Sequence, residues 1–254
     1  TLFNLATIYF CIGYDTGIKS SNDKNKLKDA INKLKVALYL FNLIKNEASL
    51  KIIRTDLPYD LYPSHLEYCI QICKIYGQRY ILKVADILGE KNYRLHSKIL
   101  LFISNLYSYL YNLSNIAPTA NAIPLEYRHY LLNRIRYYKY LVYTKLREEI
   151  KVKFDESGQG YGEMVYLQGK AVNELLECQQ DIEKCGNFIN KNELMALIKK
   201  EQLLGQEMYG LNERVYHDII PDKKEYKIEV NAGINFEHSF SSSSSFSSFS
   251  SSRN

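Results

Sequence analysis

The chain has 254 residues, of which 46% are hydrophobic and 13% aromatic, with 23 tyrosines and no tryptophan, so it can build one large domain or two small ones. The net charge of +5 is a mild basic bias that suits an acidic protein, anionic lipid or RNA equally well. Five irregularly spaced cysteines indicate reduced intracellular thiols, and no stretch approaches the roughly 20 apolar residues of a membrane span.

The first half of the chain predicts four helices. The opening TLFNLATIYFCIG is typical of an apolar helix over 2–13 that begins mid-helix, so we expect the chain to be a fragment whose preceding helices are missing. After Asp23, apolar residues recur at steps of four and three, as on one helix face, at Leu27, Ile31, Leu34, Leu38 and Phe41. Pro63 suits the first position of a third helix, which runs to about Ile87, and a fourth covers about 93–113.

The second half continues the helical pattern. A long helix is expected over about 124–153, and after the breaker DESGQGYG two more over about 162–185 and 190–214. Because no stretch shows the alternation of a strand, the sequence predicts an all-α fold, a curved array of long antiparallel helices with short connections. We expect one helical domain over 1–230, followed by a disordered serine-rich tail over 231–254.

The stretch NERVYHDIIPDKKEY predicts an extended arm after the last helix. Pro221 lacks an amide hydrogen and disfavours helix at the residue before it, so the helix ends before this proline. A frayed end would not normally gather so many apolar groups. We expect Val215, Tyr216, Ile219 and Ile220 to pack against the helical array, each fully buried side chain contributing about 1.5–3 kcal/mol.

Motifs for catalysis or metal binding are absent from the sequence. There is no Gly-rich phosphate loop, no GxSxG and no HExxH. His65, Cys69 and Cys73 share one helix face, but the outer two would lie about 12 Å apart along the axis, too far to share one ion. Buried thiols in a helix interface are the favoured interpretation. We therefore expect no enzymatic activity, no metal site and no cofactor.

The long helix over 124–153 interleaves tyrosines with cations at Arg128, Arg134, Arg136, Lys139, Lys145 and Arg147. Such a pattern suits stacking on RNA, or a partner or lipid surface. It also arises when tyrosines pack inward and cations stay in water. We favour the solvated basic face, and keep a basic helical protein that binds RNA or anionic membrane as an alternative function.

The segment RVYHDIIPDKKEY resembles the end of the BRO domain, the banana-shaped helical domain of Alix-type endosomal-sorting adaptors. Three other stretches agree in order. TLFNLATIYFCIG is similar to the family's Leu-Phe-Asn-Leu-Ala helix, and IPLEYRHYLLNRIRYYKY to the long helix after its proline loop. QGYGEMVYLQGKAVNELL resembles the Tyr-Gly-Glu start of the next helix. Together these stretches cover nearly all of 1–230 and correspond to the last two-thirds of a BRO domain.

The resemblance implies a non-catalytic scaffold that holds the amphipathic C-terminal helix of an ESCRT-III filament subunit on its concave face. The family's patch has an aromatic residue, a lysine three residues later, and two aliphatic residues four apart on the next helix. With about two extra residues in the turn, these positions correspond to Tyr80, Lys83, Leu95 and Ile99. The replacement of the family's Ala-Gln-Ala-Gln-Glu run by CKIYGQ leaves the partner subunit open.

The resemblance also implies a cytoplasmic protein that associates peripherally with endosomes, with the endosomal membrane surface as a further contact and no nucleic-acid partner. A BRO-type adaptor of pH or Rho signalling, which uses the same groove for another ligand, is the alternative within this family.

Overall fold

The computed structural model of the chain describes residues 1–20, 22–50, 58–89, 91–116 and 119–222. The main helices are α1 (Leu2–Lys19), α2 (Lys24–Leu50), α3 (Pro63–Ile87), α4 (Tyr93–Leu113), α6 (Leu125–Ser157), α7 (Tyr161–Gln180) and α8 (Lys191–Leu211). Shorter elements are η1 (Tyr59–Leu61), α5 (Thr119–Ala122), the 3₁₀ segment η2 (Ile182–Phe188) and the π-helical turn η3 (Asn212–Tyr216). None of the described residues forms a strand, so the prediction of an all-α fold is confirmed.

Local sequence sets most helix starts. Pro63 occupies the first turn of α3, where a missing amide hydrogen costs nothing. The Asn92 side chain caps α4 by accepting from the Leu95 amide at 3.0 Å. Both helices have the bounds predicted from the sequence. The first helix was predicted to end at Gly13, but α1 continues to Lys19, because its last turns pack against α2 and α3.

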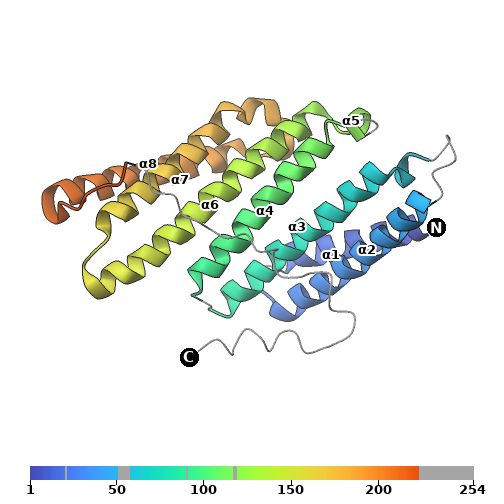
Figure 1. Ribbon diagram of the computed structural model, residues 1–254, viewed down its shortest axis with the longest axis horizontal. Coiled ribbons are helices and arrows are strands. Elements are labelled where there is room, and N and C mark those ends of the chain that lie inside the picture. The colour runs from blue at the N-terminus through green and yellow to red at the C-terminus, as the bar shows by residue number, and fades with distance from the viewer. Residues whose placement is uncertain (21, 51–57, 90, 117–118, 223–254) are drawn as a thin grey trace.

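The helices pack in chain order and form an elongated row (Figure 1). One cluster of buried side chains joins α1, α2 and α3, and the next joins α3, α4 and α6. A third joins α6, α7 and α8, and a smaller one lies where α6, α7 and α8 meet the C-terminal arm. Since α3 and α6 each contribute to more than one cluster, their buried residues are not confined to one stripe.

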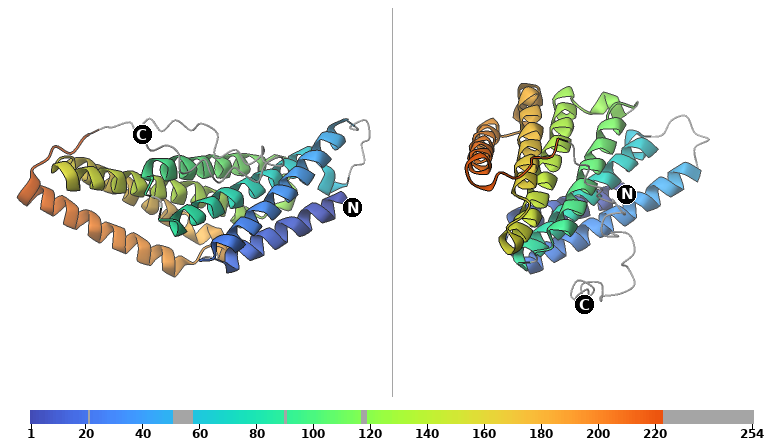
Figure 2. Two further views of the ribbon diagram at one scale, coloured as in Figure 1. Left: turned by 90° about the horizontal axis from the view of Figure 1, so that it is seen from below. Right: turned by 60° about the vertical axis from the view of Figure 1, so that its left-hand side comes forward.

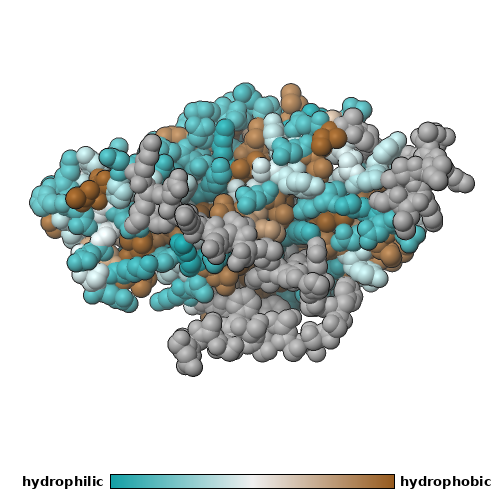
Figure 3. All heavy atoms as spheres, in the orientation of Figure 1, coloured by the Kyte–Doolittle hydropathy of each residue, from teal (hydrophilic) through white to brown (hydrophobic). Residues whose placement is uncertain are grey.

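The helices of the row lie at different depths. In the left view of Figure 2, α1 and α8 lie along the lower side, with α4 and α6 above them. On the face shown in Figure 3, hydrophobic groups are scattered between hydrophilic ones.

The expected serine-rich tail, with the rest of residues 223–254, lies outside the described residues. Within the described part of the chain, no helix is long and apolar enough to cross a membrane.

A buried polar cluster joins the last three long helices. Glu201 of α8 is 5% exposed. Its carboxylate accepts from the Tyr140 hydroxyl at 3.1 Å, Gln168 Nε2 at 3.0 Å and Arg147 at 3.4 Å. Burial, and then the negative charge of Glu201, raise the pKa of Tyr140. The carboxylate therefore stabilises α6, α7 and α8 against one another through charged and neutral donors.

Candidate protein-binding site

Tyr80, the first residue of the expected patch, is a buried contact between α3 and α1. Its side chain is 1% exposed, and its hydroxyl donates to the Tyr14 carbonyl at 3.0 Å. The ring lies across Gly17, where a Cβ would come within 2.1 Å of its Cζ atom. Only glycine permits this approach, so Tyr80 and Gly17 together fix α1 on α3.

Lys83 lies one turn further along α3 and is partly exposed. Its Nζ is 3.5 Å from the Gly17 carbonyl oxygen and 5.6 Å from the centre of the Tyr80 ring. Burial, and then the positive charge of Arg79, lower the pKa of the Lys83 ammonium. Lys83 forms no salt bridge within the described part of the chain. An ammonium group in this position can form an ion pair with a carboxylate of another molecule.

The two aliphatic residues of the expected patch lie in a different cluster from Tyr80. Ile99 is 2% exposed and belongs to the core between α3, α4 and α6. Leu95 is only partly buried and packs against the edge of this core. Tyr80 and Ile99 therefore do not form an exposed patch, and this part of the prediction is wrong. Contacts of Lys83 and Leu95 with a partner stay a prediction.

Most cations of α6 have partners inside the molecule, unlike the solvated basic face expected from the sequence. Arg136 pairs with Asp181 at 2.9 Å and Glu177 at 3.4 Å. Arg128 donates to the carbonyl of Ile123 at 3.2 Å, and Arg147 pairs with Glu201. These contacts leave few free cations for nucleic acid, so the RNA alternative gains no support.

Arg134 of α6 contacts aromatic side chains and forms no salt bridge with a described residue. Its Nε donates to the Tyr130 hydroxyl at 3.1 Å, and its Cζ lies 5.2 Å from the ring centres of both Tyr130 and Tyr137. On α3, the Arg79 Cζ lies 4.9 Å from the Tyr76 ring centre. Two guanidinium groups, one on α3 and one on α6, thus lie against tyrosine rings.

The thiols of α3 are structural groups, with Cys73 buried and Cys69 partly buried. Cys69 Sγ lies 3.8 Å from His65 Nε2, and burial raises the pKa of the Cys69 thiol to about 12. Burial also raises the pKa of Cys73 well above its ordinary value. A thiol held neutral is a poor nucleophile and a poor metal ligand. Among the described residues, no group of three His, Cys, Asp or Glu side chains could hold a metal ion.

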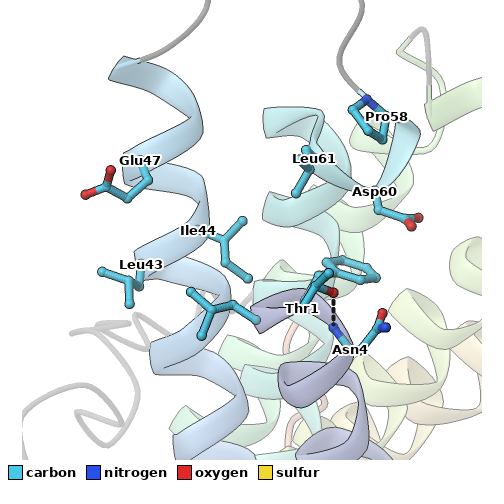
Figure 4. A pocket seen from close by; sticks show the side chains of 10 residues that line it. Thr1, Asn4, Leu43, Ile44, Glu47, Pro58, Asp60 and Leu61 are labelled. Carbon is cyan, nitrogen blue, oxygen red and sulfur yellow. Dashed lines mark hydrogen bonds between the residues drawn. The ribbon is translucent and has the colours of Figure 1, made fainter.

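A cavity that sequence reasoning missed opens between the start of α1 and the end of α2 (Figure 4). It measures about 720 Å³. Its walls are mostly apolar, from Leu2, Phe3, Leu43, Ile44 and Leu61, and its polar lining includes Thr1, Asn4, Glu47 and Asp60. No sequence motif marks it, because its residues come from three separate segments.

The C-terminal arm caps the start of α7. One oxygen of the Asp218 carboxylate accepts from the amides of Tyr161 at 2.8 Å, Gly160 at 3.2 Å and Gly162 at 3.4 Å. The Asn212 side chain holds the turn, since it donates to the Asp218 carbonyl and accepts from the Asp218 amide. The negative charge also lies at the positive end of the helix dipole.

The apolar residues of the arm differ in how far they pack against the helices. The Tyr216 ring stacks on Tyr161 with centroids 4.1 Å apart, and Ile220 packs against the same small cluster. Pro221 is partly buried. Val215 is 58% exposed and Ile219 is 90% exposed, so the expectation that all four apolar residues pack inward is wrong for these two. Polar capping and ring stacking, more than apolar burial, hold the arm.

Replacing Asp218 with alanine should lower the free energy of unfolding by about 1 kcal/mol, because three α7 amides lose their acceptor. Hydrogen exchange at the Tyr161 and Gly162 amides should accelerate. The matched control is Asp222→Ala, which removes an exposed carboxylate from the same arm. Equal exchange rates in the wild type and the Asp218 variant would contradict capping by this residue.

Comparison with known proteins assigns the family. A model described as the BRO1-like domain matches residues 1–237. The chain therefore belongs to the BRO1-like domain family, and the resemblance found in the sequence is confirmed. No curated protein sequence matches the chain.

Solved structures show the same fold. The chain is similar to the ALIX BRO1 domain in its complex with CHMP4C, at a TM-score of 0.71 and 16% identity, over 88% of this chain and 58% of that one. It is similar to ALIX in complex with the SIVmac239 PYKEVTEDL late domain, at a TM-score of 0.73 and 17% identity, over 92% of this chain and 31% of that one.

A third similar structure is described as the structural basis for endosomal targeting by the Bro1 domain, at a TM-score of 0.67 and 19% identity. Its comparison covers 88% of this chain and 57% of that one. The chain thus spans less than two-thirds of each of these three structures, and at these identities the similarity shows the fold.

Proposed function

We propose that the chain is part of a non-catalytic adaptor of the endosomal sorting pathway that binds the amphipathic C-terminal helix of an ESCRT-III subunit. The match of a BRO1-like domain to residues 1–237 carries this proposal. It is supported by the ALIX BRO1 domain, a structure of the same fold in complex with CHMP4C, and by the Bro1 domain described as an endosomal-targeting module. We accordingly propose a cytoplasmic location with peripheral association with endosomes.

The proposed contact surface surrounds Lys83. Ile87 lies one turn beyond it on α3 and is 40% exposed, and the adjacent Leu88 is similarly open. Leu95 lies across the short turn to α4 and is partly exposed. An amphipathic helix would bury its apolar side chains on these aliphatic residues while an acidic residue pairs with Lys83. Tyr80 and Ile99 are buried and are not part of this proposed surface.

Binding to synthetic C-terminal helices of ESCRT-III subunits, measured by calorimetry, tests the proposal. Ile87→Asp should weaken binding by about 2 kcal/mol or more, because it places a carboxylate against the apolar side of the ligand helix. Lys83→Ala should cost about 1 kcal/mol, as a rim ion pair is partly screened. The matched control is Lys91→Ala, an exposed lysine in the α3–α4 turn, which should bind normally.

Two outcomes would count against the proposal. If no ESCRT-III helix bound to the wild-type protein, the proposed partner would be wrong. If a helix bound and both the Ile87 and Lys83 variants kept full affinity, the contact surface would lie elsewhere. Circular dichroism of each variant checks that the helical fold is kept.

A further inference from the structure

Two arginines, one on α3 and one on α6, lie against tyrosine rings. Arg79 comes from α3 and lies over Tyr76, whereas Arg134 comes from α6 and lies over Tyr130 and Tyr137. Tyr107 of α4 stacks on Tyr138 of α6, with ring centroids 5.4 Å apart. Other aromatic rings lie next to each arginine's tyrosines: Tyr14 of α1 contacts Tyr76, and Phe188 of η2 contacts Tyr130.

Some of the same tyrosines act on the pKa values of both arginines. Burial works against the charge of Arg79, yet nearby tyrosines, Tyr138 and Tyr107 first, hold its pKa above the ordinary value. Burial likewise works against the charge of Arg134, while Tyr130 first, and then Tyr107 and Tyr138, hold its pKa above the ordinary value. Geometry agrees, because Arg79 lies one turn after Ile75, and Ile75 packs in the same buried cluster as Tyr107 and Tyr138.

Neither arginine has an acidic partner within the described part of the chain. The contrast with other arginines of α6 is direct, because Arg136 and Arg147 both form ion pairs there. Lys83 adds a third cation without a salt bridge, one turn after Arg79 on α3. Partly desolvated guanidinium groups without a counter-ion raise the free energy of the free protein, and an added anion would relieve this cost.

We propose that Arg79 and Arg134 form a carboxylate-binding site, which takes an Asp or Glu side chain from the ligand helix of this domain. Arg134 Nε donates to the Tyr130 hydroxyl. Its two terminal nitrogens can then donate to the two oxygens of one carboxylate. The tyrosine rings exclude water around the ion pair, and the partly exposed Tyr76 and Tyr130 supply contact area for the rest of the ligand helix.

The partial burial of both arginines favours a protein side chain over a membrane. Arg79 and Arg134 are only partly exposed, and both lie against aromatic rings. A flat array of lipid phosphates meets projecting cations easily but contacts partly buried ones poorly, whereas a Glu side chain can extend from its helix to a partly buried guanidinium group. The choice of a helix as ligand rests on the function proposed above, but the site itself can be tested without it.

The first experiment is a titration with sodium acetate, at ionic strength held constant with sodium chloride, followed by the ¹⁵N NMR signals of the arginine Nε groups. Signals of Arg79 and Arg134 should shift with saturation, and that of Arg136, which already holds two carboxylates, should not. Unchanged Arg79 and Arg134 signals would overturn the proposal, whatever binds elsewhere on the domain.

The second experiment pairs protein variants with ligand variants. Arg134→Gln should weaken binding of the acidic ESCRT-III helix about tenfold, because a charged hydrogen-bonded pair is lost. The same variant should weaken binding of a helix with amides in place of its carboxylates by less than twofold. Arg136→Gln is the matched control on α6 and should change neither affinity. If Arg134→Gln unfolds, Arg134→Lys replaces it, with a smaller loss that keeps the same dependence on ligand charge.

The outcomes separate the two proposals. A positive acetate titration without helix binding would sustain the carboxylate site and reject the proposed partner. Helix binding with equal losses for the acidic and amide helices would overturn the site and leave the partner standing. If Arg134→Gln abolished binding to anionic phospholipid vesicles and left helix binding unchanged, the site would be a lipid-phosphate site and the proposal would be wrong.

Discussion

Replacement of Glu201 with alanine is expected to lower the free energy of unfolding by about 3–5 kcal/mol, as measured by urea denaturation. The residue is 5% exposed, and its carboxylate is shared by Tyr140, Arg147 and Gln168. Its removal leaves the Arg147 guanidinium and the Tyr140 hydroxyl without their buried acceptor. An isolated buried donor keeps its full desolvation cost, so the loss exceeds the strength of any one hydrogen bond.

The matched control for this prediction is Asp155→Ala on the same long helix, α6. Asp155 pairs with Lys151 at 2.9 Å, but both side chains are well exposed, so this variant should cost less than about 1 kcal/mol. The variant Glu201→Gln keeps the shape and the hydrogen-bond acceptor, and should fall between the two. Similar losses for Glu201→Ala and Asp155→Ala would show that the buried cluster contributes no more than a surface ion pair.

The sequence predicted helix starts more reliably than helix faces. The bounds of α3 and α4 follow from Pro63 and Asn92, whose effects are local: one fits a first turn without an amide hydrogen, and the other supplies a capping oxygen. Faces depend on which neighbours a helix meets. Tyr80 packs against α1 and Ile75 against α4 and α6, so α3 has apolar residues on opposite sides and its periodicity does not separate core from surface.

Three functional features carry no sequence signal for a related reason. Glu201 lies between Lys200 and Gln202 in an ordinary polar stretch, and only the fold places it beside α6 and α7. Asp218 caps a helix that begins at Tyr161, far earlier in the chain. That no described acidic residue pairs with Arg79 becomes visible only when the surrounding helices are in place. Contacts between residues far apart in the chain, unlike local helix capping, cannot be predicted from the spacing of residues in the sequence.

Replacement of Ile99 with aspartate is expected to cost about 4 kcal/mol or more and to abolish the cooperative unfolding transition at ordinary temperatures. Ile99 is 2% exposed, in the core that joins α3, α4 and α6. The substitution removes a buried aliphatic side chain and also places a carboxylate among buried apolar side chains. Circular dichroism during thermal unfolding would record a low and broad transition.

Leu95→Asp is the matched control for Ile99→Asp, because Leu95 lies one turn earlier on α4 and is partly exposed. This variant should keep the helical signal and a cooperative transition, since its carboxylate can reach water. If the proposed contact surface is correct, it should also weaken binding of the ligand helix, by about tenfold for a charge placed at the edge of an apolar contact. A folded Ile99→Asp variant with impaired binding would restore Ile99 to the binding surface and would require a rearrangement of α4 in solution. An unfolded Ile99 variant beside a folded, weakly binding Leu95 variant would place the boundary between core and binding surface within a single turn of α4.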